Sequence, residues 1–332
     1  MTYVQAYANQ NWQIGQESSA GGGGGAGHKL LSFAVVPTHK LNVATFKAPG
    51  HHYNTETGLE QQWFETAITG DMSFTEVLWL LEAMYGAGTK TTPGGATLAR
   101  QRVYTPPLTG AITPKTFETQ WGDSNDVKTA LYNLIKDMTF KFDRAAGMSI
   151  SGAGLSALQS HGGSFTSTPT ALANRPMTGS MLNFYFDTTG AGIGTTQQQL
   201  SFQSAQIDVK GLYDVYWDAD RAQPTWATHV NDTPTTTVKI DLNENDNTRT
   251  LVTNLLLNET YFLRIDVEDA ANSIETGERF TLQWDLALRL TDLGAYGPKQ
   301  KVLYREATFE LIEDATWGKA HVITSITGED TL

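Results

Sequence analysis

The sequence predicts a mainly β protein, and three observations carry that prediction. Runs of alternating apolar and polar residues recur along the 332-residue chain, and a period of two indicates strands with one buried and one solvated face. Charged residues make up 17% of the chain, below the roughly 25% typical of soluble domains, and its 31 glycines suit tight turns. Only one stretch has a clear helical period. Many short strands joined by turns indicate sandwich or barrel sheets.

The clearest strand pair occupies residues 134–155. Apolar side chains alternate with polar ones on both sides of the segment Asp143–Gly147, which indicates two half-buried antiparallel strands. Gly147 supplies the positive φ that a short hairpin loop usually requires. The alternating apolar residues are Met138, Phe140, Phe142, Met148 and Ile150. We expect this hairpin to be the frame on which the first half of the chain is assembled.

Residues 73–85 carry the helical pattern. Ser73 and Glu76 have the spacing of a capping box, and Gly86 stands where a helix ends. Apolar residues form a continuous stripe along this segment and also occupy a second side. We therefore predict a helix that is covered on more than one side, either by two sheets of its own chain or by a neighbouring subunit.

Residues 15–28 form a glycine-rich segment with five consecutive glycines. Such a segment costs much conformational entropy to order, so we predict a mobile arm or loop. Its glycines also match the spacing of phosphate-binding motifs. However, His28 and Leu30 stand where those motifs need other residues, and no convincing strand precedes the segment. The sequence therefore favours an arm or loop over a phosphate site.

The chain divides into an N-terminal half, residues 1–160, and a strand-rich C-terminal half, residues 161–332. Gly, Ser, Thr and Pro are frequent between residues 152 and 180, which indicates a long connection between the halves. No second helix is expected. The strands expected in the second half are Met181–Asp187, Leu200–Trp217, Thr236–Leu242, Arg249–Leu257, Thr260–Glu268, Arg279–Leu290, Val302–Ile312 and His321–Ile326.

Two short internal similarities point to a duplication. Asp137–Ala145 parallels Asp214–Ala222, and Phe117–Trp121 shares a Phe-x-x-Gln-Trp register with Phe280–Trp284. A duplication would make the C-terminal half a second β-sandwich packed on the first. Chance similarity between short segments is the alternative.

The search for a reactive or ligand-binding site yields no candidate. Gly154–Leu158 lacks the last glycine of a hydrolase elbow. His51 and His52 beside Glu56 come nearest to a metal cluster, but a solvated turn accounts for them better. Asp241–Asn247 begins like a calcium-binding loop without its required glycine. The chain has 0 cysteines, which excludes disulfides and thiolate sites. We therefore predict no catalytic, cofactor-binding or metal-binding residue, and no enzyme.

The charge is negative and unevenly distributed. The formal net charge is −12, which argues against a protein that grips a nucleic-acid duplex, because phosphate neutralisation needs clustered Lys and Arg. Nine acidic and two basic residues lie between Asp241 and Glu278. A solvated face that keeps the protein soluble accounts for this stretch. The alternative is a wall that faces a polyanion without binding it.

The expected compartment follows from what the sequence lacks. The first residues show neither the basic nor the apolar region of a signal peptide. The longest apolar runs, near residues 30–36 and 77–81, are too short to span a bilayer. We expect assembly in a reducing cytoplasm and no membrane insertion.

Several segments combine into a pattern of one apolar helix, central strands and closing strands. They are Met72–Gly86, Phe117–Asp123, Ile135–Phe142, Gly147–Ser151, Tyr304–Asp314 and Gly318–Ile323. In order and residue type they resemble the major tail tube proteins of tailed bacteriophages of the siphophage type. The similarity covers about half of the chain and consists of residue-type patterns.

The resemblance implies a structural virion protein with a tail-tube-type β-sandwich or barrel and one flanking helix. Six protomers would form a ring, and stacked rings would form the hollow tail tube through which DNA passes to the host without specific binding. The implied partners are other copies of the chain, the tape measure, terminator and distal tail proteins. The implied location is the virion tail, after assembly in the host cytoplasm.

Two other functions remain open from the sequence. A different β-rich virion component, such as a tail terminator, baseplate or decoration protein, would form a single ring or isolated oligomer. A carbohydrate-binding β-sandwich would use exposed Trp and Tyr side chains and would be a monomer.

Overall fold

The structure is a computed structural model that describes residues 10–23, 25–123, 126–165, 169–171, 174–198, 201–218, 225–256, 259–299 and 301–330. It confirms a mainly β protein, with 59% of the residues in strands and 7% in helices. Nearly all of the strands belong to one large hydrogen-bonded network, and a separate pair, β14 and β15, forms a small second sheet.

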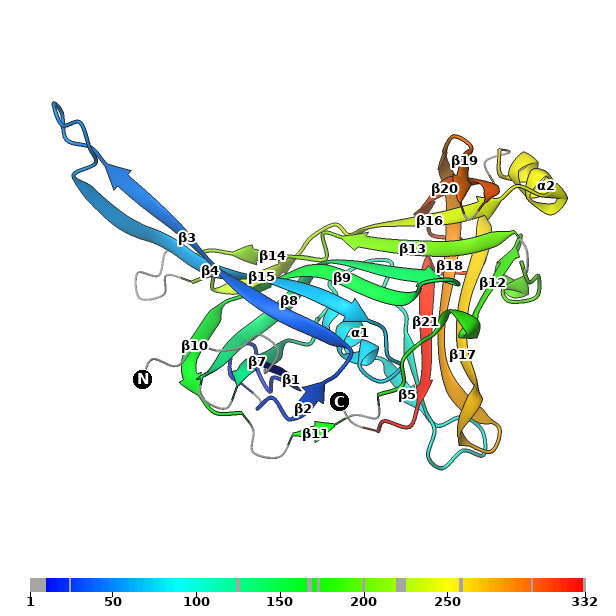
Figure 1. Ribbon diagram of the computed structural model, residues 1–332, viewed down its shortest axis with the longest axis horizontal. Helices are drawn as coiled ribbons and strands as arrows, with labels where there is room; N and C mark the ends of the chain where they lie inside the picture. The colour runs from blue at the N-terminus through cyan, green and yellow to red at the C-terminus, as the bar shows by residue number, and fades with distance from the viewer. Residues whose placement is uncertain are drawn as a thin grey trace.

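The elements follow the chain from a small N-terminal hairpin to two long C-terminal strands (Figure 1). The first half contains β1 (Asn11–Gln16), β2 (His28–Leu30), β3 (Phe33–Phe46), β4 (Glu56–Asp71), α1 (Val77–Tyr85), β5 (Thr89–Thr91), β6 (Arg100–Tyr104), β7 (Phe117–Asp123), β8 (Asp126–Asp143), β9 (Gly147–Ser156) and β10 (Leu158–Gly163). The second half contains β11 (Thr170–Ala171), β12 (Leu182–Asp187), β13 (Phe202–Lys210), β14 (Tyr213–Tyr216), β15 (Thr228–Asn231), β16 (Thr235–Asn243), α2 (Asp246–Leu255), β17 (Tyr261–Glu275), β18 (Glu278–Leu293), β19 (Gly297–Lys299), β20 (Val302–Leu311) and β21 (His321–Thr327).

Strand β8 is the most connected element of the first half. Its C-terminal part pairs with β9 on one edge and with β13 on the other, and Lys141 lies opposite both Ser149 and Gln206. Its N-terminal part pairs in the same way with β10 and β7. The β8–β9 register runs from Leu134–Leu155 to Asp143–Gly147, and Gly147 has a φ of 88°. The predicted hairpin is therefore confirmed, including the residue that closes it.

The second half continues the same sheet. β16 lies between β13 and β20, and β18 pairs with β17 on one side and with β20 and β21 on the other. β6 then adds to β21, so that a strand from the first half lies beyond the C-terminal strands. Hydrogen bonds thus join the two halves at β8–β13 and at β21–β6. The division of the chain near residue 160 and the internal duplication stay predictions.

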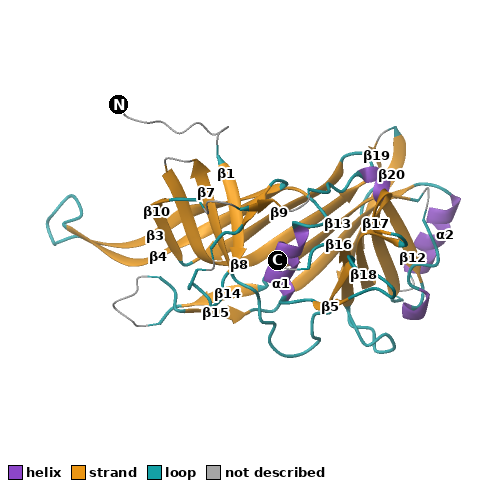
Figure 2. Ribbon diagram, turned by 90° about the horizontal axis from the view of Figure 1, so that it is seen from below, coloured by secondary structure: helices purple, strands orange, loops and turns teal. Residues whose placement is uncertain are grey.

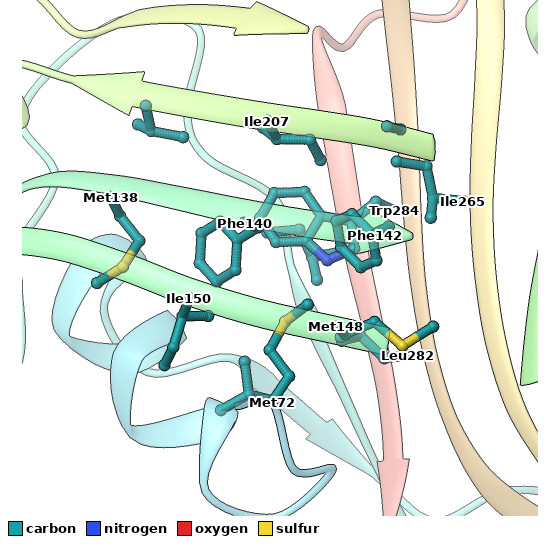
Figure 3. Close-up of a cluster of buried hydrophobic side chains, with 14 of the residues drawn as sticks. Met72, Met138, Phe140, Phe142, Met148, Ile150, Ile207, Ile265, Leu282 and Trp284 are labelled. Atoms are coloured by element: carbon teal, nitrogen blue, oxygen red, sulfur yellow. The ribbon is translucent and has the colours of Figure 1, made fainter. Parts of the chain in front are cut away.

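The main core cluster has contributions from both halves, and a smaller second cluster contains Tyr132, Leu134, Ala157 and Trp226. Trp284 of β18 lies 4.9 Å from the ring of Phe140 and 6.4 Å from that of Phe142, measured between centroids. Figure 3 shows these rings between β8 and the C-terminal strands, with Met72, Met148 and Ile150 beside them. The apolar face of the predicted hairpin is therefore covered by the second half of the same chain.

Helix α1 begins later than the sequence predicts and has no capping box. Ser73 forms a β-bridge with Pro176, and the amide of Phe74 donates to the carbonyl of Arg175, so both residues lie before the helix, although the carbonyl of Ser73 still accepts from the amide of Val77 at 3.1 Å. The carboxylate of Glu76 instead accepts hydrogen bonds from the amides of Leu31 and Ser32 at 2.8 and 2.9 Å.

The surroundings of α1 decide between the two kinds of cover that its sequence allows. Seven of its nine residues are buried within the single chain, including Trp79 and Leu80 on its second apolar side. In Figure 1 the helix lies below the sheet that contains β8 and β9, beside β21. The prediction of a helix covered on more than one side is thus confirmed, and its own chain supplies the cover.

The prediction of a strand at residues 249–257 is also wrong, because residues 246–255 form the helix α2. Its Val and Thr residues favour strands by propensity. The deciding local signal is Asn245, whose side-chain oxygen accepts from the amide of Thr248 at 2.9 Å, as an N-terminal cap does. The range expected as one strand over residues 200–217 is divided at Gly211 into β13 and β14.

The glycine-rich segment 15–28 is a loop that connects β1 to β2, with residue 24 outside the described residues. The amide of Gly21 donates to Glu17, and that of Gly25 donates to Glu118. Gly15 lies so close to the loop that an added Cβ would meet the carbonyl oxygen of Gly25 at 2.1 Å. The prediction of a loop is thus confirmed, and the alternative of an arm that reaches away from the body is wrong. The strand β1 precedes the segment, although no strand was expected there.

Candidate assembly surface

The residues that came nearest to metal ligands in the sequence do not form a site. His51, His52 and Glu56 lie at the exposed end of the β3–β4 hairpin. In the segment that imitates a calcium loop, Glu244 is paired with Arg249 at 2.7 Å. Within the described ranges, no group of three His, Asp or Glu side chains is arranged to hold a metal ion.

The acidic stretch between Asp241 and Glu278 does not form one continuous face. It passes through β16, α2, β17 and the start of β18. Several of its carboxylates have structural roles: Asp269 accepts from the amides of Ala271 and Asn272, and Glu268 pairs with Arg279.

Glu275 holds a distant loop through its carboxylate. The amides of Thr97, Leu98 and Ala99 donate to it at 2.7–2.9 Å. These backbone hydrogen bonds lower the pKa of Glu275 to about 2. The carboxylate therefore serves the fold rather than a chemical step.

Helices that could cross a bilayer are absent from the described part of the chain.

The most unusual surface is the outer part of the β3–β4 hairpin. β3 and β4 pair from Phe33–Gly70 to Phe46–Glu56, but β9 covers β4 only between Phe64 and Asp71. Residues 40–63 therefore form a two-stranded segment, which we call the ribbon. At about 3.3 Å per residue its strands extend roughly 23 Å from Trp63 to Glu56. Both ribbon views show it leaving the body at the end opposite α2 (Figures 1 and 2).

Large apolar side chains on the ribbon are exposed to solvent. Leu41, Val43 and Leu59 share one face, because Val43 lies opposite Leu59 and Leu41 is two residues from Val43 on the same strand. Their exposed fractions are 55%, 43% and 51%. Phe46 lies on the other face and is 57% exposed. An isolated two-stranded hairpin is marginally stable in water, so apolar residues on it indicate a partner that covers them.

The tip of the ribbon has a defined conformation. The amide of Thr55 donates to the carbonyl of Phe46 at 2.7 Å, and that of His51 donates to Ala48 at 3.1 Å. Gly50 adopts a φ of 82° within this turn. Tyr53 projects from it with 85% of its surface exposed. The closed turn thus holds this phenol outward, away from the rest of the chain.

The base of the ribbon is fixed to the body by aromatic contacts. The rings of Trp63 and Trp217 meet edge to face at 6.0 Å between centroids. Nearby, Tyr132 packs on Trp226 at 4.3 Å, and its hydroxyl lies 2.9 Å from Nδ1 of His229. Tyr132 has a φ of 56°, a strained conformation for a non-glycine residue. This anchored base gives the ribbon a fixed direction.

The outer edge of β3 is open. Among the strands that the structure describes, β3 pairs with β4 alone. Pro37 lies in this strand, and proline is typical of edge strands because it has no amide to donate. An edge of this length is a template for pairing with a strand from another chain.

Strand-like alternation is visible in the sequence at residues 41–46 and 63–69, which cover only part of the ribbon. Residues 56–62 are mainly polar on both faces, and such strands have a weak hydrophobic period. The sequence feature that indicates an exposed apolar strand is the alternation of Leu41, Val43 and Thr45, because the strand that faces it is mainly polar. No family model and no curated protein matches this chain.

Proposed function

We propose that this protein is a structural subunit that polymerises into the hollow tail tube of a tailed bacteriophage. The observation that carries the proposal is the ribbon: a fixed, projecting hairpin whose apolar side chains lack a cover within the described part of the chain. The sequence resemblance supplies the identity of the assembly, a stack of six-membered rings.

The ribbon supports a contact between different surfaces of two copies. It projects from one end of the molecule (Figure 1), and a projecting element cannot cover itself on an identical ribbon unless the copies are related by a two-fold axis. A contact between two different patches closes into a ring or repeats into a filament. Such a repeat lets one kind of subunit build a long tube.

The open edge of β3 supports the same assembly. Pairing with a strand of an adjacent copy would satisfy its free backbone groups, and successive pairings would extend one sheet around a ring. The net charge of −12 suits a channel for DNA, because a negative wall repels phosphate within about 8 Å at physiological salt.

Negative-stain microscopy of the purified protein over a range of concentrations tests the proposal. Long hollow filaments of uniform width support a tube subunit. Single rings would instead indicate a terminator, baseplate or decoration protein, and monomers at all concentrations would contradict both virion functions.

A charge placed on the ribbon makes the test specific. We expect V43D/L59D to abolish filaments while the subunit stays folded by circular dichroism, because a partner cannot cover two carboxylates without a large desolvation cost. The control is L256D, which places a charge on another exposed leucine, 66% exposed, after α2. Filaments from the ribbon variant, or their loss in the control, would contradict the assignment of the ribbon.

A further inference from the structure

A pocket with a volume of about 490 Å³ lies at the base of the ribbon. One of its walls is the start of the ribbon, on β3 and β4, and the other belongs to the strands β7, β8 and β10. Ligand-binding pockets in proteins commonly measure about 300–1,000 Å³. The pocket therefore has room for a small molecule or for a side chain of another protein.

The polar groups that line this pocket can donate hydrogen bonds. An ammonium only donates, and each imidazole and each primary amide carries at least one N–H. Within the described ranges, no Asp or Glu lines the pocket, although the chain has 35 acidic and 23 basic residues. The pocket therefore suits an occupant that accepts hydrogen bonds. Its polar lining residues are His39, Gln62, Lys128, Gln159, His161 and Thr225.

Lys128 gives the pocket a positive charge. Its ammonium lies 3.8 Å from the carboxylate of Asp126, and its side chain is 25% exposed. This separation is longer than the roughly 2.7–2.9 Å of a charge-assisted hydrogen bond. An ammonium has three N–H donors, so Lys128 can serve a further acceptor. Hydrogen bonds between charged groups are stronger than neutral ones, which favours an anionic occupant.

The rest of the lining is apolar and aromatic. Phe64 and Trp121 are 7% and 5% exposed, and Leu158 is 45% exposed. The ring of His39 stacks on Phe64 with centroids 4.6 Å apart. Such walls favour an apolar stem. An occupant that combines a short hydrocarbon stem with a terminal carboxylate, as Asp and Glu do, matches both parts of the lining.

The pocket continues the apolar face of the ribbon. Pro37, His39, Leu41 and Val43 are alternate residues of β3, so their side chains lie on the same face. His39 in the pocket is about 7 Å along the strand from Leu41. A second copy that covers Leu41 and Val43 would therefore reach the mouth of the pocket as well.

We propose that this pocket receives an aspartate or glutamate side chain of a second copy of the chain. The inference rests on the proposed function, since it adds a polar contact to the surface that the ribbon would bury on assembly. Charge complementarity supports this occupant, because a chain with a net charge of −12 offers mainly carboxylates, and the pocket supplies a cation and N–H donors. Such a contact fixes the register of the two copies more than it adds affinity.

Neutralising Lys128 tests the contact. We expect K128Q to raise the protein concentration needed for assembly at least about tenfold, because a charge-assisted hydrogen bond is lost, and to weaken the dependence of assembly on salt. The matched control is K136Q on the same strand, since Lys136 also has an ion pair of 3.8 Å, with Asp214. This control should assemble like the natural chain. Equal effects of the two variants, or none from K128Q, would overturn the inference.

Photo-crosslinking identifies the occupant. A benzophenone side chain replaces Leu158 in assemblies of natural and isotope-labelled copies, so that mass spectrometry distinguishes links between copies from links within one copy. We expect links between copies, to a segment that contains Asp or Glu. A benzophenone at Leu256, 66% exposed and after α2, should link to other segments.

The acid found in this way provides the decisive variant. Its replacement by the corresponding amide should raise the assembly concentration as K128Q does, and the two substitutions together should add little, because both remove one contact. Links within one copy alone, or additive effects of the two substitutions, would overturn the inference.

The two proposals fail in different ways. Filaments that K128Q and K136Q affect equally would leave the tube function standing and remove the contact. Closed rings with an effect specific to K128Q would establish the contact and contradict the tube. Citrate that stabilises the unassembled natural subunit but not K128Q, with assembly of the two unchanged, would show that the pocket takes a free carboxylate and would overturn the second copy as its occupant.

Discussion

Two long hairpins of this protein both carry large apolar side chains, but only one of them is covered by the rest of the chain. In β8 and β9, alternating apolar residues such as Phe140 are buried completely, whereas in the ribbon Phe46 is 57% exposed. Both are antiparallel pairs, and each contains one register shift. The difference is the number of neighbours: β8 and β9 have further strands on both edges, and the ribbon has none along residues 40–63.

The comparison separates two uses of an apolar strand face. On β8 the face packs against Trp284 and stabilises the subunit. On the ribbon it is exposed in the single chain, and under the proposed function a second copy covers it, so we expect it to contribute to association and not to folding. Substitutions in the two hairpins should therefore affect different measurements.

The largest effect should come from the buried hairpin. We expect F140A to lower the free energy of unfolding by about 4 kcal/mol, because it leaves a cavity beside Trp284. Urea unfolding of the unassembled subunit measures this loss. A loss below about 1 kcal/mol would mean that the hairpin is not the centre of the core.

A buried polar contact extends the comparison to the edge of the body. Arg102 is 4% exposed, lies 3.8 Å from Glu82 and donates to the carbonyls of Glu329 and Asp330. We expect R102M to cost on the order of 3 kcal/mol, since it removes the arginine beside the partly buried carboxylate of Glu82 and leaves only the effect of Lys115. The double variant E82Q/R102M should recover part of the loss. If the double variant is as unstable as R102M, the ion pair with Glu82 is not the source of the stability that Arg102 contributes.

Acid should destabilise the body in two separate steps. His321 has a pKa of about 4 in the fold and about 6.5 when unfolded, so protons bind the unfolded chain more tightly. The part of the free energy of unfolding that depends on neutral His321 is therefore complete above about pH 6.5, and it is lost as the pH falls towards 4. Over this range we expect about 3 kcal/mol of stability to disappear, and H321F should remove that slope in urea unfolding.

Glu275 should act at lower pH. Its pKa is about 2 in the fold and about 4.3 when unfolded. The stability it gives is therefore complete above about pH 5 and is lost as the pH falls towards 2. Hydrogen exchange at Thr97–Ala99 should increase in that range for the natural chain. The variant E275Q, which does not titrate, should show no such pH-dependent step.

The smallest effect on folding should come from the ribbon. The change F46A is chemically identical to F140A, but we expect the stability of the unassembled subunit to change by no more than about 0.5 kcal/mol. A loss comparable to that of F140A would mean that the ribbon folds onto its own body, and the comparison between the two hairpins would no longer hold.

Much of the fold could be predicted because local patterns matched it. The alternation around Phe140, the turn at Gly147 and the strands after residue 260 were each correct. One failure came from a long-range contact, because the bridge between Ser73 and Pro176 displaced the start of α1. A second failure was local, because the cap at Asn245 was overlooked beside a β-favouring composition.

The sequence by itself determined that this protein is built of strands with few charges, without cysteine chemistry and with one very apolar helix. It could do so because period and composition are properties of neighbouring residues. Only the tertiary structure decided which apolar faces have cover within the chain. It placed Phe140 under Trp284, left Leu41 and Val43 on a projecting ribbon, and brought Tyr85 to His321 across 236 positions of sequence. Cover depends on which strands become neighbours, and that is set by the whole chain and not by any segment of it.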